Sequence, residues 1–337
     1  MRLLSNVSLC SIATLLLVGG FSPAQELNPR ASLGGRFVGI IKGVAFSPDG
    51  KLVAVSDDVG AFKLFETATG KEVATLKEGT DKVGGVWSLS FSPDGKTLAG
   101  GDFEGAVQLW EVAGRRHTAT LSVGKKTAVM TVAFSSDGKL VAAGYLDATV
   151  RIWEVATRKE LQSFTGNVRI VTEIAFSPDG KTLVVAGGER LKPGTVKLWD
   201  VATGKESLAL AGHTGQVTAV AFSPDGKMLA TGAETFAFEK NPNLKLWNVQ
   251  TGKEVVALKG HWGLVSVLAF APDGKTLISV SAGDLDYSLR QWDVTTGNEL
   301  SKRTGFVFIA RPFPGREDAG GAVSECGPAL GHGKAEG

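Results

Sequence analysis

The sequence predicts an all-β fold made of six copies of one four-stranded unit. A hairpin signature, (Ser/Ala)-(Pro/Ser)-Asp-Gly-Lys, recurs six times, with its aspartate at Asp49, Asp94, Asp137, Asp179, Asp225 and Asp273. Each copy is followed by an aromatic residue and then a polar one: Phe65-Glu66, Trp110-Glu111, Trp153-Glu154, Trp199-Asp200, Trp247-Asn248 and Trp292-Asp293. The signatures lie 42 to 48 residues apart. This period is typical of propellers and solenoids, in which each unit needs neighbours to bury its apolar face.

The fifth repeat shows the pattern of strands within one unit. Val217 to Phe222 is a short apolar run with β-branched residues and predicts an inner strand. The Ser-Pro-Asp-Gly turn that follows leads into a second strand over Met228 to Gly232. Alternation over Asn243 to Val249 predicts a third strand, and Glu254 to Leu258 a fourth, outer one. Four strands in about 45 residues are the spacing of a propeller blade.

These repeats resemble the WD40-repeat family over about residues 30 to 304. The resemblance rests on the Trp-Asp and Trp-Glu pairs, on Gly212-His213 and Gly260-His261, and on the repeated Ser-Pro-Asp-Gly. It implies a β-propeller in which a blade can be locked by hydrogen-bonded His, Ser or Thr, Asp and Trp side chains. The last full repeat alone offers all four residues: His261, Ser279, Asp286 and Trp292.

Residues 1–24 are typical of a secretory signal peptide. Arg2 is followed by a mostly apolar run from Leu9 to Val18 and by the small-residue site Ser22-Pro23-Ala24. A run of about ten apolar residues is short for a membrane span, although an uncleaved anchor is the alternative. We therefore expect export to the periplasm or the medium, cleavage before Gln25, and no membrane span afterwards. One cysteine, Cys326, then remains, so no internal disulfide is expected.

The number of blades depends on the two ends of the repeat region. Residues 30–33 resemble the outer strand that precedes each inner strand, and such a strand completes the last blade in WD40 propellers. The tail, residues 305–337, has eight Gly and three Pro and no Trp-Asp pair. We expect a seven-blade plan with a degenerate or partial last blade in this tail. A closed ring of six blades is the alternative.

Composition and motifs argue against catalysis and against nucleic-acid binding. Lys and Arg number 36 against 34 Asp and Glu, a formal net charge of +2, which gives no basic footprint for nucleic acid. No HExxH, metal-spaced Cys/His cluster, G-x-S-x-G or phosphate-binding loop occurs. The repeated aspartates fit tight turns better than Ca²⁺ sites, because the EF-hand spacing is absent. We expect no enzyme activity, no cofactor and no bound metal.

Loop length distinguishes the last three repeats from the first three. From turn glycine to aromatic residue the distance is 15 residues in repeats one to three and 18 to 21 in repeats four to six. The additional residues lengthen the loop between the second and third strands, and insertions in repeat proteins often map to a binding face. The candidate partner-binding residues on this side are Arg190, Lys192, Phe236, Phe238, Lys240, Trp262, Asp284 and Tyr287. Neutral drift in loop length is the alternative.

The function expected from these features is that of a non-catalytic scaffold that binds a protein or peptide through its loop rim. The WD40 resemblance implies the same, because those domains mostly bind proteins or peptides. One alternative is a small-ligand or enzymatic site in the central channel. Another is that the chain is a fragment of a larger multidomain protein.

Overall fold

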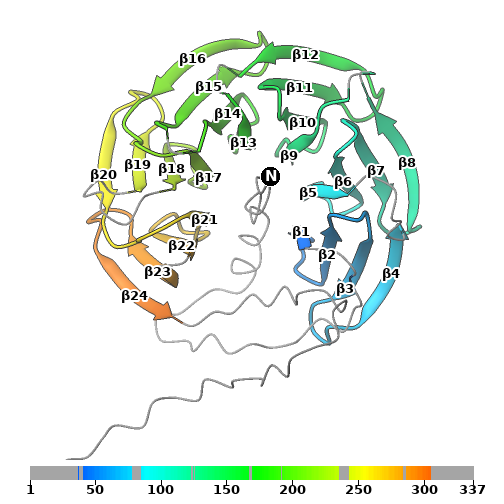
Figure 1. Ribbon diagram of the computed structural model, residues 1–337, viewed down its shortest axis with the longest axis horizontal. Coiled ribbons are helices and arrows are strands. Elements are labelled where there is room, and N and C mark those ends of the chain that lie inside the picture. Colours follow the sequence, from blue (N-terminus) through cyan, green and yellow to red (C-terminus); the bar gives the residue numbers. More distant parts are fainter. Residues whose placement is uncertain are drawn as a thin grey trace, which may run out of the picture.

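The computed structural model contains six four-stranded antiparallel sheets arranged around an axis (Figure 1). It describes residue 37 and residues 41–304, except for 78–84, 123, 125, 167–168, 191, 235–242 and 284–285. Within this part of the chain, no helix is long and apolar enough to cross a membrane. The protein is a six-bladed β-propeller, so the six predicted four-stranded repeats are confirmed. The predicted signal peptide, the strand at 30–33 and the tail 305–337 lie outside the described residues.

The two inner strands of every blade form a hairpin closed by the Asp-Gly signature. The innermost strands are β1 (Ile41–Phe46), β5 (Val86–Phe91), β9 (Val129–Phe134), β13 (Val171–Phe176), β17 (Val217–Phe222) and β21 (Val265–Phe270). The second strands are β2 (Leu52–Asp57), β6 (Thr97–Asp102), β10 (Leu140–Tyr145), β14 (Thr182–Gly187), β18 (Met228–Ala233) and β22 (Thr276–Gly283).

The third strand of every blade contains the aromatic-polar pair, and the fourth strand forms the outer wall of the disc-shaped propeller. The third strands are β3 (Phe62–Glu66), β7 (Val107–Glu111), β11 (Thr149–Glu154), β15 (Thr195–Asp200), β19 (Leu244–Asn248) and β23 (Asp286–Asp293). The outermost strands are β4 (Glu72–Lys77), β8 (Arg116–Leu121), β12 (Glu160–Thr165), β16 (Lys205–Leu210), β20 (Glu254–Leu258) and β24 (Glu299–Thr304).

The signature turn is held by its own serine and aspartate. In the fifth blade, Ser223 Oγ donates to Asp225 Oδ1 at 2.6 Å, and the Lys227 amide donates to the same oxygen at 3.0 Å. Gly226 has φ +70°, which few residues other than glycine adopt without strain. The expected role of these aspartates as turn residues is therefore confirmed. The serine hydrogen bond comes first among the causes that lower the pKa of Asp225, ahead of the backbone bond.

The apolar core lies between neighbouring blades. Leu244 and Leu258 of the fifth blade belong to the same buried cluster as Leu277 and Trp292 of the sixth. Each blade thus buries a face against the next one, as expected for a unit that cannot bury its own surface.

Small residues bring neighbouring blades close together. A Cβ atom on Gly144 of β10 would lie 2.3 Å from Val171 Cγ1 in the next blade, so no side chain fits there without movement. This register position is small in the first five blades: Ser56, Gly101, Gly144, Ala186 and Gly232. In the sixth blade it is occupied by the larger Val280.

The arc of described blades is open between the sixth and the first. The innermost strands contact one another in chain order from β1 to β21, but no comparable contact joins β21 to β1 among the described strands. Figure 1 shows the interval between these blades. The described strands therefore do not close a ring of six, and the partial seventh blade expected in the tail lies outside them.

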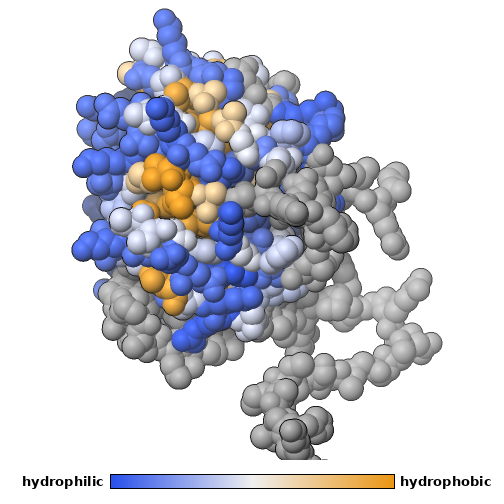
Figure 2. All heavy atoms as spheres, turned by 90° about the vertical axis from the view of Figure 1, so that its left-hand side faces the viewer, coloured by the Kyte–Doolittle hydropathy of each residue, from blue (hydrophilic) through white to orange (hydrophobic). Residues whose placement is uncertain are grey.

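The outer wall of the disc mixes isolated apolar residues with charged ones. Figure 2 views the wall on the side of β16, β20 and β24, where separate apolar patches lie among hydrophilic side chains. Val255 and Leu300, each 54% exposed, belong to this wall. Scattered exposed apolar residues are ordinary on soluble proteins, so the wall gives no strong indication of a binding surface.

Candidate functional site

Two sets of loops meet at one edge of the disc, which we call the rim. One set enters the inner strands and the other joins the second strands to the third. Backbone hydrogen bonds tie the two sets together: the Leu146 amide donates to Ala128 O at 3.0 Å, and the Glu234 amide donates to Gln216 O at 2.9 Å. The two sets of loops therefore lie on one rim.

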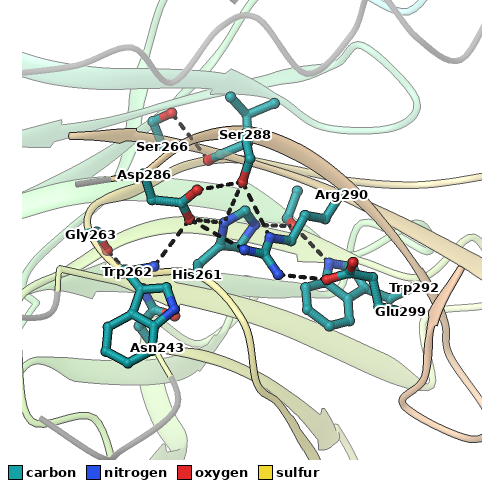
Figure 3. A network of polar contacts seen from close by, with 12 residues as sticks. Asn243, His261, Trp262, Gly263, Ser266, Asp286, Ser288, Arg290, Trp292 and Glu299 are labelled. Atoms are coloured by element: carbon teal, nitrogen blue, oxygen red, sulfur yellow. Dashed lines mark hydrogen bonds and ion pairs between the residues drawn. The ribbon is translucent and has the colours of Figure 1, made fainter. Parts of the chain in front are cut away.

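In the sixth blade, His261, Ser279, Asp286 and Trp292 are linked in one hydrogen-bonded network next to the rim (Figure 3). Trp292 Nε1 donates to Ser279 Oγ at 2.7 Å, and Ser279 Oγ lies 2.7 Å from His261 Nε2. His261 Nδ1 lies 2.7 Å from Asp286 Oδ2. Because a carboxylate can only accept, Nδ1 carries the proton and Nε2 accepts from the serine hydroxyl.

Burial sets the protonation states of this network. It lowers the pKa of His261, although the hydrogen bond to Asp286 acts in the opposite direction. Burial alone would raise the pKa of Asp286, but hydrogen bonds from His261, Ser288 and the Trp262 amide outweigh it and hold the pKa well below its usual range. A neutral imidazole therefore faces a carboxylate at neutral pH.

Arg290 extends the network to the outermost strand. Its Nη1 donates to Glu299 Oε2 at 2.5 Å, and its Nη2 lies 3.9 Å from Asp286 Oδ2. The pair formed by Arg290 and Glu299 belongs to a ladder that repeats in five blades; the other pairs are Lys63–Glu72, Arg151–Glu160, Lys197–Glu206 and Lys245–Glu254. In the second blade, Gln108 and His117 occupy these positions, 2.8 Å apart. The ladder ties third strands to fourth strands on the wall and is structural.

The fifth blade carries a partial lock. His213 Nε2 lies 2.6 Å from Thr231 Oγ1, which also accepts from Trp247 Nε1 at 2.7 Å. His213 Nδ1 is buried and meets no hydrogen-bond partner among the residues that the structure describes. Burial, followed by the Lys245 ammonium, lowers the pKa of His213 to about 3. This histidine is therefore neutral at physiological pH.

Trp262 is the most exposed large apolar side chain among the described residues, at 57%. Its loop is nevertheless held on both sides. The Trp262 amide donates to Asp286 Oδ2 at 3.0 Å, and Asn243 Nδ2 of the preceding blade donates to Gly263 O at 2.7 Å. In Figure 3 its ring lies apart from the polar network that fixes its backbone. The Trp262 indole is thus exposed to solvent, while hydrogen bonds from its loop to Asp286 and Asn243 hold its backbone in place.

The other predicted rim residues have different surroundings. Arg190 pairs with Glu234 at 3.1 Å, and Lys192 pairs with Glu189 at 2.8 Å, so both cations are engaged within the rim. Tyr287 is 51% exposed. The remaining candidates lie outside the described residues: Phe236, Phe238, Lys240 and Asp284.

Sequence reasoning missed two features of the inner strands. Lys42 Nζ lies over the Trp87 ring, 5.2 Å from its centroid, beside the rim of the short-loop blades. Glu173 lines a cavity of about 270 Å³ together with Ser88 and Ser90 on the inner strands. Comparing the second and third positions of the six inner strands would have found both residues, because the other blades mostly have small residues there.

The described residues contain no group of three or more His, Cys, Asp or Glu side chains placed to hold a metal ion. The turn aspartates are engaged with their own turn amides, and the lock carboxylate is engaged with His261, Ser288 and Trp262. Their oxygens serve hydrogen bonds inside the blades.

Two segments of the chain, residues 70–111 and 252–293, match the family described as "WD domain, G-beta repeat". Each match begins just before an outermost strand, β4 or β20, and ends at the third strand of the next blade, β7 or β23. These two segments of the β-propeller are therefore similar to WD40 repeats. Each matched segment spans two neighbouring blades and adds a covalent link across the apolar interface between them.

The chain also matches a second family and one individual protein. Residues 106–261 match the family described as "Eukaryotic translation initiation factor eIF2A". An uncharacterised WD repeat-containing protein of Nostoc sp. is 46% identical over 52 residues, which are 15% of this chain and 3% of that relative. The aligned part is thus a very small share of the relative's length.

Proposed function

We propose that this WD40 propeller is a non-catalytic scaffold that binds a protein or peptide through its rim. The observation that carries the proposal is Trp262, a 57% exposed indole on a loop fixed by Asp286 and Asn243. Exposed aromatic side chains that lose little freedom on binding are frequent centres of binding energy in protein interfaces. WD40 propellers are commonly binding scaffolds, which supports the same conclusion.

The direct test compares proteins captured by the immobilised chain and by its Trp262→Ala variant. Loss of a central aromatic anchor typically costs at least about 2 kcal/mol, or roughly a thirtyfold loss of affinity. We expect a specific partner to be depleted from the variant, while its melting temperature stays close to that of the original chain.

Val255→Ala is the matched control for this experiment. Val255 is exposed to a similar degree, at 54%, but lies on the outer wall rather than on the rim. Equal capture by the original chain and the Trp262→Ala variant, or equal losses in both variants, would count against the rim. The same comparison with Phe236→Ala and Phe238→Ala tests the long loop of the fifth repeat.

We also propose that the chain acts outside the cytoplasm. The support is the leader-like composition of residues 1–24, with Arg2, an apolar run and a small-residue site before Gln25. Mass spectrometry of the chain purified from the exported fraction of its host should give a mature N-terminus at Gln25. Full-length chain found only in the cytoplasm would contradict the proposal.

A further inference from the structure

A second set of aromatic and apolar side chains lies on the rim of the short-loop blades. Lys42 Nζ lies 5.2 Å from the Trp87 ring centroid, and the Trp87 ring lies 5.5 Å from that of Phe103. Trp87 also packs with Ala128 and Met130 of the third blade. These contacts join blades one, two and three beside the inner strands.

Part of this set faces solvent. Phe103 is 41% exposed and Leu146 is 42% exposed, whereas Trp87, which packs against Phe103, is 8% exposed. Phe103 and Leu146 occupy the same place in adjacent blades, since their amides donate to Gly85 O and Ala128 O at 3.2 and 3.0 Å. We call Lys42, Trp87, Phe103 and Leu146 the Lys42 patch.

The Lys42 ammonium gives this patch its chemical character. The Lys42 side chain is buried, with the whole residue 8% exposed, and it forms no ion pair with any carboxylate of the described residues. The carboxylates that end β2 and β6 serve their own hairpins instead: Asp57 Oδ1 accepts from the Ala61 amide at 2.7 Å, and Asp102 Oδ1 accepts from the Ala106 amide at 2.8 Å. A positive charge with a buried stem therefore stands beside an apolar surface.

Equivalent positions in the other half of the molecule are used differently. Thr172 and Thr218 occupy the place of Lys42 in blades four and five. Their hydroxyls donate to Val217 O and Val265 O of the next blade at 2.5 and 2.7 Å. Threonine hydroxyls therefore link neighbouring blades by hydrogen bonds there. Lys42 makes no hydrogen bond of this kind among the described residues.

We propose that the Lys42 patch binds a peptide segment in which an Asp or Glu residue adjoins a large apolar side chain. The carboxylate pairs with the Lys42 ammonium over the Trp87 ring, and the apolar side chain covers Phe103 and Leu146. A charge-assisted hydrogen bond next to buried aromatic rings is a strong and specific interaction. The inference rests on the proposed function in using the rim, but it assigns partner chemistry to blades that do not include Trp262.

The test uses the full ¹⁵N-labelled chain and two short peptides, acetyl-Leu-Asp-Leu-amide and acetyl-Leu-Asn-Leu-amide. The Trp87 indole N–H signal, identified by its loss in Trp87→Phe, reports binding. The acidic peptide should bind at least about tenfold more tightly than the amide peptide, as expected for a hydrogen bond to a charged group. Lys42→Met should remove this preference, and Phe103→Ala should weaken both peptides.

Control variants separate this proposal from the first one. Trp262→Ala and Val255→Ala should leave both peptide affinities unchanged, and circular dichroism should show the same strand content in every variant. Lys42→Gln is the second charge-removing variant and should match Lys42→Met. Equal affinities for the two peptides, or an acid preference that survives in both Lys42 variants, would overturn the proposal. Capture of a partner through Trp262 would be unaffected by that outcome.

Discussion

The carboxylate of Asp286 accepts a hydrogen bond from His261 Nδ1 at 2.7 Å. This bond connects the loop that enters the innermost strand of the sixth blade with the start of its third strand. The same oxygen accepts from the Trp262 amide at 3.0 Å. One buried acid therefore holds both the blade lock and the base of the exposed indole. A change at this acid should affect the stability of the blade and the order of the rim together.

Asp286→Asn should lower the free energy of unfolding by about 1–3 kcal/mol, the usual range for a buried hydrogen bond to a charged group. The amide cannot accept from both His261 and Trp262 with the same strength as a carboxylate. Urea unfolding measures the loss, and amide exchange at Trp262 should become faster. Asp293→Asn, at an exposed turn, is the control and should have the smaller effect. Equal stability of both variants would contradict this role for Asp286.

His213 should make the folded state sensitive to mild acid. Its pKa is lowered to about 3 in the folded chain, against about 6.5 in an unfolded one. Between these values the unfolded chain binds more protons, so the free energy of unfolding falls as the pH drops, by up to about 1.4 kcal/mol per pH unit. Below about pH 3 this loss is complete.

The variant His213→Gln isolates that effect. Its free energy of unfolding should decline less steeply between about pH 6.5 and about pH 4 than that of the original chain, whatever its value at pH 7. Urea titrations at several pH values give the two slopes. Parallel slopes would show that His213 is not the group responsible.

The sixth signature turn lacks two hydrogen bonds that the serine makes in the other five: one donated to the aspartate and one accepted from the amide five residues on. Ala271 takes the place of the serine, so Asp273 Oδ1 accepts only from the Lys275 amide at 2.9 Å among the described groups. Ala271→Ser should supply both missing bonds and stabilise the fold by about 1–3 kcal/mol. Thermal unfolding measures the increase, and Ser223→Ala, the reverse change in the fifth blade, should show a loss of similar size.

The same serine bond also sets a pH window. It leads the causes that lower the pKa of Asp225, so its contribution is present above about pH 4 and is lost as the pH falls further. The stability difference between Ser223→Ala and the original chain should therefore shrink in acid. A difference that stays constant down to about pH 2 would argue against the carboxylate.

Gly144→Ala should destabilise the interface between the third and fourth blades. The new Cβ would lie 2.3 Å from Val171 Cγ1, and a β-branched side chain has little freedom to move away. Overpacking of this kind costs about 1–3 kcal/mol. The double variant Gly144→Ala with Val171→Ala should recover part of the loss, which calorimetry can measure. The natural Ala186 at the same register is the control position, and Ala186→Gly should cost about 1 kcal/mol or less.

Local chemistry made much of the architecture predictable. The strands Val217–Phe222 and Glu254–Leu258 agree with the sequence-based bounds, because β-branched runs and Gly turns mark their ends within a few residues. His261 and Ser279 could be aligned with a family pattern because their spacing equals that of His213 and Thr231. Turn and strand signals of this kind depend on neighbours in sequence.

The Lys42 patch could not be predicted in the same way. Lys42 and Trp87 hold the same position in two neighbouring inner strands, whereas Phe103 follows β6. Their contact depends on how the blades pack around the axis. Likewise, the sequence indicated Arg190 only as a candidate partner-binding residue, but in the structure it pairs with Glu234, 44 residues further along the chain. Such pairings follow from the angle between blades, and the repeat period alone does not show which side chains meet.

Five interfaces join the six described blades in succession, so these blades form a chain with two ends rather than a loop. In a closed ring of blades, the loss of one interface leaves every blade connected through the remaining interfaces. In a chain, each interface alone connects everything before it to everything after it. Among the described blades, the contact between Gly144 and Val171 divides three from three, so weakening it should split one calorimetric transition into two, each belonging to three of these blades.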